Sequence, residues 1–237
     1  MTTITLETAD GPIEALFVVP TGGEGPWPGV VIVHDIFGLT TDVQNIAQRV
    51  ADAGYVVITP NLFSRGGPAR CIIRVFRELM AQRGQALEDL QAAKSFLQGR
   101  DECAGPIGIV GFCMGGQFAL VMAPQGFAAS APFYGVPLPR NLDTVLQGAC
   151  PVVASFGSRD PLGIGAANKL RRVLDNKGVT NDVKVYPGVG HSFANRAPAQ
   201  PLMRIIGFGY DEDATEDAWR RVFEFFAEHL VPDSDRV

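Results

Sequence analysis

Apolar residues along the chain fall into short continuous runs separated by longer stretches with helical spacing. The continuous runs are rich in β-branched residues, which is typical of strands covered on both faces. They predict buried strands at 29–33, 55–60, 108–112 and 151–156. Between them, apolar side chains recur every three or four residues, which predicts amphipathic helices. These helices are expected at 42–53, 71–82, 84–99, 117–123, 165–177 and 215–230.

Two further stretches give weaker strand signals. Residues 126–133 are apolar but less regular, and residues 182–186 alternate as in a more exposed strand. At the N-terminal end, residues 3–8 and 13–19 flank Asp10-Gly11. Asp-Gly between two apolar segments indicates a hairpin. We therefore expect an antiparallel N-terminal strand pair joined to a mostly parallel, twisted sheet with helices on both faces.

Length and composition agree with a single α/β domain over residues 1–237. The chain has 46% hydrophobic and 19% charged residues, as is usual for a globular enzyme. A net charge of −5 without a basic cluster argues against nucleic acid as a partner. We find neither a leader peptide nor an apolar run of the roughly 20 residues that a membrane helix needs. We expect a cytoplasmic monomer or small homo-oligomer without a membrane partner.

The four cysteines, Cys71, Cys103, Cys113 and Cys150, are scattered along the chain. No Cys-x-x-Cys pair or matching histidine spacing is present, so we expect no zinc or other metal. Three of them are interpreted as small packing residues. Cys113 differs because of its neighbours.

Cys113 stands at the apex of Gly-Phe-Cys-Met-Gly, between a predicted strand and a predicted helix. This is the arrangement of a nucleophile elbow, in which a sharp turn exposes the reactive side chain. Glycines flank the turn because a Cβ atom would not fit there. A helix N-terminus favours a thiolate, so the position suits a reactive cysteine.

Asp160 and His191 each follow a later predicted strand. Loops at the carboxyl ends of parallel strands gather at one edge of the sheet, so these side chains are expected beside Cys113. The chain order nucleophile, acid, histidine is that of α/β-hydrolases. Alternatively, Asp160 could cap the helix after Pro161.

The two other histidines have simpler interpretations. His34 ends a strand and is expected to make a structural or substrate contact, and His229 lies near the end of the last helix. An oxyanion hole is expected from the backbone N–H of Met114, directly after the nucleophile, and that of Ile36 in the loop after the 29–33 strand.

Several segments together resemble the dienelactone hydrolase (carboxymethylenebutenolidase) family over about residues 12–230. They are His34-Asp-Ile-Phe-Gly-Leu39, Pro60-Asn-Leu-Phe63, Gly111-Phe-Cys-Met-Gly-Gly116, Phe133-Tyr-Gly135, Asp160-Pro161 and Tyr186-Pro-Gly-Val-Gly-His-Ser-Phe193. The resemblance implies an α/β-hydrolase fold and a Cys113–His191–Asp160 triad. It also implies hydrolysis of a lactone or ester through an acyl-cysteine, without a metal or organic cofactor.

The resemblance further implies that Asp35 replaces a glutamate that contacts the resting thiol. A plainer alternative is a loop carboxylate that caps the 42–53 helix or pairs with Arg65. Family substrates carry a carboxylate held by arginines, for which Arg65 and Arg196 are the candidates here. Asn195 stands where the family pattern has an arginine, and the 197–213 segment, with Arg204, is longer than the pattern.

Three more residues in the matching motifs are expected to contact substrate: Phe37, Tyr134 and Ser192. Tyr134 could alternatively be a packing aromatic. Two alternatives remain open at this stage. One is a general carboxylesterase or thioesterase of the same family with a different pocket. The other is a ligand-binding or sensor protein that keeps a hydrolase fold without catalysis.

Overall fold

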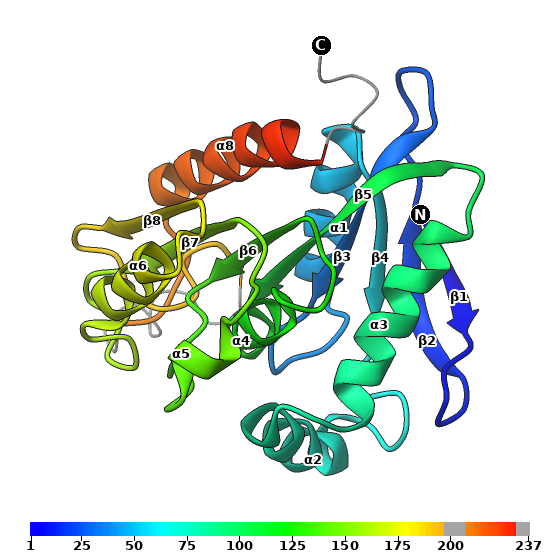
Figure 1. The fold of residues 1–237 in the computed structure, drawn as a ribbon. Coiled ribbons are helices and arrows are strands. Elements are labelled where there is room, and N and C mark those ends of the chain that lie inside the picture. Colours follow the sequence, from blue (N-terminus) through cyan, green and yellow to red (C-terminus); the bar gives the residue numbers. More distant parts are fainter. Residues whose placement is uncertain (197–206, 231–237) are drawn as a thin grey trace.

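The computed structural model describes residues 1–196 and 207–230 of the chain. Its centre is one eight-stranded sheet (Figure 1). The strands lie in the order β1 (Thr2–Leu6), β2 (Ile13–Val18), β4 (Val56–Pro60), β3 (Trp27–Val33), β5 (Cys103–Phe112), β6 (Ala129–Phe133), β7 (Val152–Gly157) and β8 (Asn181–Tyr186). β2 is antiparallel to both β1 and β4, and the remaining neighbours are parallel. The predicted fold class is confirmed.

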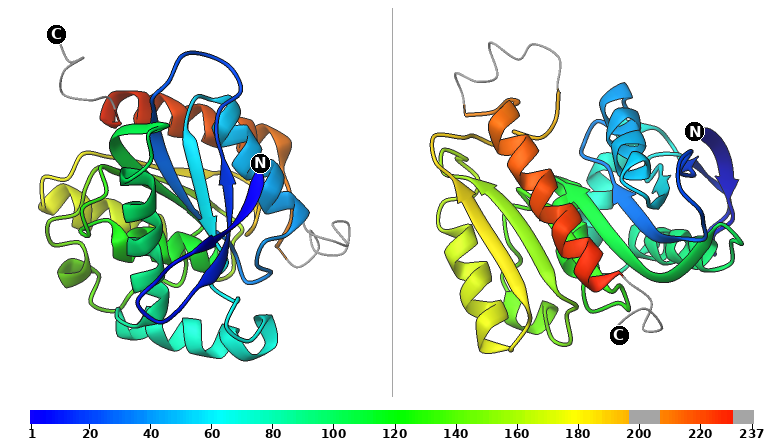
Figure 2. Two further views of the ribbon diagram at one scale, coloured as in Figure 1. Left: turned by 90° about the vertical axis from the view of Figure 1, so that its right-hand side faces the viewer. Right: turned by 90° about the horizontal axis from the view of Figure 1, so that it is seen from above.

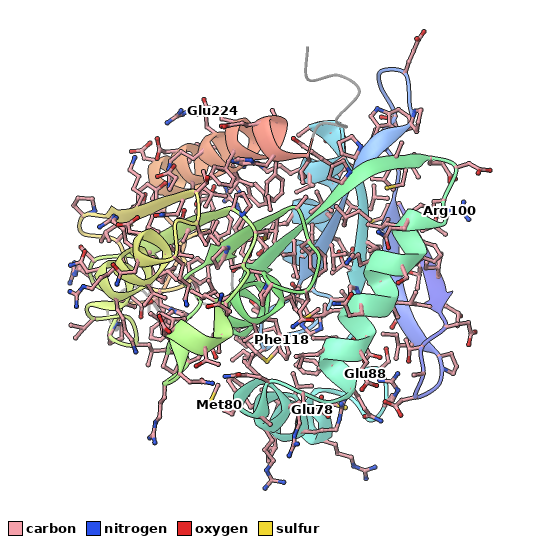
Figure 3. The ribbon with its side chains drawn as sticks, viewed as in Figure 1. Glu78, Met80, Glu88, Arg100, Phe118 and Glu224 are labelled. Carbon is pink, nitrogen blue, oxygen red and sulfur yellow. The ribbon has the colours of Figure 1, made fainter. Side chains whose placement is uncertain are left out.

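Helices cover both faces of the sheet (Figure 2). One apolar cluster packs the sheet against α1 (Thr41–Asp52) and α8 (Glu212–His229). The other joins the opposite face to α2 (Pro68–Ala81), α3 (Gln85–Gln98), α4 (Met114–Met122), α5 (Leu142–Val145) and α6 (Ala166–Asn176). Figure 3 shows Phe118 of α4 inside this second layer, where it is fully buried, while Glu224 of α8 points outward.

The central strand β5 leads directly to Cys113. It pairs with β3 on one side and β6 on the other, and residues 107–112 are all buried. One residue, Cys113, separates its end from the first residue of α4. The ends of β5, β7 and β8 lie at the same edge of the sheet, so the loops after them can meet.

The structure differs from the predicted elements mainly at their ends. β5 begins at Cys103 rather than 108 because Cys103 already pairs with Trp27 of β3. α2 begins at Pro68, since proline is well suited to the first turn of a helix. α8 begins at Glu212, where Asp211 caps it by accepting the Ala214 N–H at 3.0 Å. The four-residue α5 is too short to show a helical period.

The cysteines other than Cys113 pack as predicted. Cys71 is buried, while Cys103 and Cys150 are half-buried against the second apolar cluster. None of the four forms a disulfide. Within residues 1–196 and 207–230, no helix combines the length and apolar character needed to cross a membrane.

Candidate active site

The backbone at Cys113 is held in a strained turn. Its φ and ψ angles are 55° and −114°, a conformation that non-glycine residues rarely adopt. A Cβ on Gly111 would lie 1.9 Å from the Gly115 carbonyl oxygen, and one on Gly115 would lie 2.1 Å from the Val33 carbonyl oxygen. The two glycines therefore let β3, β5 and α4 approach closely enough to form the turn.

Asp160 and His191 form a buried hydrogen-bonded pair beside this turn. The distance between His191 Nδ1 and Asp160 Oδ2 is 2.7 Å, and both side chains are 1% exposed. Asp160 Oδ1 also accepts the Leu162 N–H at 2.9 Å. The helix that follows, α6, begins after Gly165 without a side-chain cap. Asp160 thus orients the imidazole and shapes its own loop, and it does not cap α6.

The electrostatics of His191 favour a charged ring. Burial lowers its pKa, but the Asp160 hydrogen bond and the Cys113 sulfur outweigh burial and raise the pKa of His191 to about 9. Nε2 has no hydrogen-bond partner of good geometry among the described residues. The ring nitrogen that is not bound by Asp160 is therefore available to exchange a proton with the sulfur or a substrate.

Cys113 and His191 open into one cavity of about 520 Å³, including the solvent at its mouth. Its lining consists of Asp35, Ile36, Phe37, Cys113, His191, Ser192, Asn195, Phe208 and Gly209. Ile36 and the thiol thus share the cavity, and Met114 opens α4, where its N–H has no carbonyl one turn earlier to bond.

Asp35 is 7% exposed and faces the same cavity. Its Oδ1 accepts the Phe37 N–H at 2.8 Å. Burial raises the pKa of Asp35 to about 6, with a further rise from Asp42, against the lowering effects of the Phe37 hydrogen bond and His191. Thr40 caps α1 and Arg65 pairs with Asp89, so neither plainer alternative for Asp35 is found.

Tyr134 lies beneath the cavity rather than on its wall. It is fully buried, and its ring centre lies 5.0 Å from that of His191. Its hydroxyl donates to Asn195 Oδ1, while Asn195 Nδ2 donates to Asp42 Oδ2 at 2.9 Å. This chain of hydrogen bonds fixes the floor of the site and uses both ends of the Asn195 amide.

Residues 13–230 match the model of the dienelactone hydrolase family. The chain belongs to the dienelactone hydrolase family. A carboxymethylenebutenolidase of Pseudomonas putida is 27% identical over 222 residues, covering 89% of each chain.

Solved structures agree with the fold. A dienelactone hydrolase-like promiscuous phosphotriesterase from metagenomic libraries has a TM-score of 0.78 at 24% identity, covering 97% of this chain and 99% of its own. An esterase of Pyrobaculum calidifontis has a TM-score of 0.67 at 18% identity, covering 97% and 85%. These neighbours are α/β-hydrolase fold proteins, and the dienelactone hydrolase family is hydrolytic.

The two arginines suggested by the family pattern do not line the Cys113 cavity. Arg65 binds Asp89 at 2.8 Å, and its other contacts are the Thr8 hydroxyl and the Gly11 carbonyl. It thereby ties the first hairpin to α3. The Arg196 guanidinium lies 3.8 Å from the centre of the Tyr210 ring, in a neighbouring hollow. Arg204 falls outside the described residues.

The two other histidines of this dienelactone hydrolase family member do not line the Cys113 cavity. His34 is fully buried, donates from Nδ1 to the Asp35 carbonyl at 2.6 Å and accepts the Leu62 N–H at 3.1 Å. Burial lowers the pKa of His34 to about 4, so it stays neutral. His229 contacts the Phe225 ring on α8.

Two residues that line the cavity, Phe208 and Gly209, were missed by the sequence analysis. Phe208 lies in the segment 207–209, which we call the strap, and pairs with His191 as a parallel bridge. The His191 N–H donates to the Gly207 carbonyl at 2.6 Å, and the Gly209 N–H donates to the His191 carbonyl at 2.9 Å. The available signal was an aromatic residue between two glycines, inside the stretch that is longer than the family pattern.

Proposed function

We propose that this chain hydrolyses a lactone or carboxylic ester through an acyl-cysteine intermediate. The observation that carries the proposal is the strained Cys113 elbow in one cavity with His191, whose other nitrogen is held by Asp160. Cys113 is assigned as the nucleophile, His191 as the proton carrier and Asp160 as the residue that orients it.

Acylation begins with transfer of the thiol proton to His191. The pKa of His191, raised to about 9, supports its role as the acceptor of that proton. The thiolate attacks the carbonyl carbon, and the carbonyl electron pair moves to oxygen. The N–H groups of Met114 and Ile36 are assigned to stabilise this oxyanion. When the carbon–oxygen bond breaks, the leaving enolate or alkoxide takes the proton from the imidazolium.

Deacylation uses the neutral imidazole that remains. His191 takes a proton from water as the water oxygen attacks the thioester carbon. Collapse of the second tetrahedral intermediate releases the carboxylic acid and returns the thiolate. A thiolate nucleophile must stay reduced, so the proposal includes the reducing conditions of the cytoplasm.

The remaining cavity residues are assigned to substrate contact or to control of the thiol. Phe37 and Ser192 lie on the cavity wall, and Tyr134 supports its floor through Asn195. Asp35 and Cys113 line the same cavity, which supports a role for Asp35 in setting the charge of the resting thiol. Within the described residues, no cluster of histidine, cysteine and acidic side chains could hold a metal ion.

A general carboxylesterase is the second candidate, because no arginine or lysine lines the described part of the cavity. Hydrolysis of p-nitrophenyl acetate and of an uncharged enol-lactone by the wild type and by Cys113→Ala tests both candidates. Turnover of both substrates by the wild type alone supports the proposal. Turnover of the ester without the lactone selects the second candidate. Turnover of neither favours a binding protein, and activity in Cys113→Ala overturns the nucleophile.

A further inference from the structure

The charge around the Cys113 cavity bears on which substrates it accepts. Apart from the triad, the ionisable side chain on its described wall is Asp35, which is acidic. Asp42 lies near enough to act on Asp35 and on Tyr134. Both carboxyl groups repel a second negative charge brought into the cavity. Among the described lining residues, only the His191 ring offers a positive charge, and His191 is assigned to exchange a proton with Cys113.

The neutral polar group that could replace a cation is already engaged. Asn195 occupies the position where the family pattern has an arginine, and it lies on the cavity wall. Its amide nitrogen donates to Asp42 and its oxygen accepts from Tyr134. Turning this amide toward a substrate carboxylate would break both hydrogen bonds inside a buried site, which is costly.

The apolar part of the wall is supplied by Phe37, Ile36 and Phe208. Phe37 is 53% exposed, as expected for an aromatic side chain at a cavity mouth rather than in the core. Phe208 packs on the catalytic ring, with 5.0 Å between the ring centres of Phe208 and His191. Contact between these side chains and an apolar acyl group is favourable because it removes apolar surface from water. The same side chains cannot form a hydrogen bond or an ion pair with a carboxylate.

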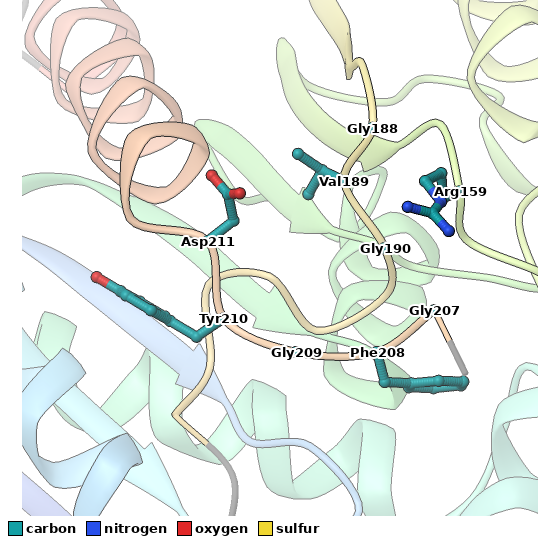
Figure 4. Close-up of a pocket in the computed structure, with 9 residues that line it drawn as sticks. All are labelled: Arg159, Gly188, Val189, Gly190, Gly207, Phe208, Gly209, Tyr210 and Asp211. Carbon is teal, nitrogen blue, oxygen red and sulfur yellow. The ribbon is translucent and has the colours of Figure 1, made fainter. Parts of the chain in front are cut away.

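The strap also separates the cavity from a nearby arginine. Phe208 and Gly209 line the Cys113 cavity and also a second hollow of about 540 Å³ that contains Arg159. In Figure 4 the Phe208 ring extends from the strap away from Arg159. A Cβ on Gly190 would lie 2.1 Å from the Gly207 carbonyl oxygen, so the strap is seated closely against the loop that carries His191.

We propose that the Cys113 cavity selects uncharged esters or lactones with an apolar acyl group, and that Phe208 is a specificity-determining residue. This proposal rests on the hydrolase function proposed above. An anionic acyl group would enter beside Asp35, against two aromatic rings, and without a cation from the described wall. An apolar acyl group of the same length would cover those rings instead.

A pair of matched esters tests the selectivity. p-Nitrophenyl butyrate and mono-p-nitrophenyl succinate share the leaving group and chain length, and differ in a terminal methyl or carboxylate. We expect kcat/KM of the wild type to be about 100-fold higher for the butyrate, because the carboxylate of the succinate would lie beside the like charge of Asp35. Equal rates, or a preference for the succinate, would overturn the proposal.

A second measurement does not depend on hydrolysis. Alkylation of Cys113 by neutral iodoacetamide and by anionic iodoacetate is followed by peptide mass spectrometry, with glutathione as the reference thiol. We expect iodoacetate to be disfavoured at Cys113 by about 10-fold or more relative to glutathione. If neither ester is hydrolysed but this preference holds, the hydrolase function fails and the charge selectivity stands. Equal relative rates contradict the selectivity itself.

Substitutions then test the role of the wall. Phe208→Arg is expected to reduce the butyrate preference by about 10-fold, because it places a cation beside the acyl group. Phe37→Arg, at the exposed mouth of the cavity, should also reduce the butyrate preference. It tests the charge selectivity of the cavity if Phe208→Arg fails to fold. Ile164→Arg is the matched control, since Ile164 is 89% exposed and does not line the cavity. If the Phe208 variant folds and behaves like the control, the assignment of Phe208 is wrong.

Discussion

Asp160 divides its two carboxylate oxygens between His191 and its own loop. Oδ2 accepts from His191 Nδ1 at 2.7 Å, and Oδ1 accepts the Leu162 N–H at 2.9 Å. The second bond keeps the first in place, because it fixes the rotation of the carboxylate. One side chain therefore sets both the direction of the imidazole ring and which of its nitrogens carries the proton.

Replacing Asp160 by Asn should separate these two effects. The amide oxygen can still accept the Leu162 N–H, so the loop is expected to remain folded. The amide NH₂ would then face His191 Nδ1 and favour the wrong tautomer. We expect kcat/KM on p-nitrophenyl acetate to fall by about 10²–10⁴-fold with little change in melting temperature. A fall of less than about threefold would show that Asp160 does not orient the base.

The charge on His191 should depend on Cys113. The Asp160 hydrogen bond and the Cys113 sulfur both raise the pKa of His191, whereas burial lowers it. We therefore expect the NMR titration midpoint of His191 to be near pH 9 in the wild type and lower in Cys113→Ser. His34, with a pKa of about 4, should not titrate in the same range. An unchanged midpoint in Cys113→Ser would contradict the proposed ion pair.

Asp35 should make the protein less stable as the pH rises. Its pKa is about 6 in the folded chain against 3.8 for an ordinary aspartate, so the unfolded chain loses the proton first as the pH rises through this range. The contribution of Asp35 to the free energy of unfolding is then expected to fall by up to about 3 kcal/mol from pH 3 to pH 7. Asp35→Asn removes this dependence while keeping an acceptor for the Phe37 N–H.

Urea unfolding at pH 4 and pH 8 measures that effect. We expect Asp35→Asn to stabilise the protein relative to the wild type more at pH 8 than at pH 4. Asp10→Asn removes one negative charge at an exposed position and is the matched control. If the two variants show the same change between the two pH values, the raised pKa of Asp35 is contradicted.

The glycines of the elbow should not tolerate a methyl group. A Cβ on Gly115 would lie 2.1 Å from the Val33 carbonyl oxygen, and neither backbone can shift without breaking the β3–α4 contact. We expect Gly115→Ala to abolish activity and to lower the melting temperature by more than about 5 °C. Gly22→Ala, where a Cβ meets nothing within 4 Å, should leave both unchanged. Equal melting temperatures would contradict this account of the turn.

The sequence predicted those features that depend on local pattern. β-Branched runs placed the buried strands, and Asp10-Gly11 placed the antiparallel pair, because both signals are carried by neighbouring residues. Cys113, Asp160 and His191 could be chosen because strand ends meet at one edge of a parallel sheet. In the structure, Asp160 is hydrogen-bonded to His191, and His191 and Cys113 line the same cavity. Their catalytic roles remain predictions.

Other features depend on partners that no local pattern reveals. Arg65 was a candidate for substrate because it is basic and near the right motif, yet its partner is Asp89 on α3. Phe208 reaches the cavity only because the strap pairs with the backbone of His191. Tertiary pairing decided both positions. The hydrogen bond of Asp35 is local by contrast, to the Phe37 N–H two residues later, and its contact with the thiol stays a prediction.

The bridge between His191 and the strap also has a consequence for synthesis of the protein. A ribosome makes the three proposed triad residues by position 191, but the backbone of His191 gains its two hydrogen bonds only with Gly207 and Gly209. A nascent chain that ends just after His191 therefore lacks the strap residues that line the cavity. It also lacks the two hydrogen bonds that hold the backbone of His191. Cys113 is made 96 residues before Gly209, so the proposed site is complete only after the strap has been synthesised.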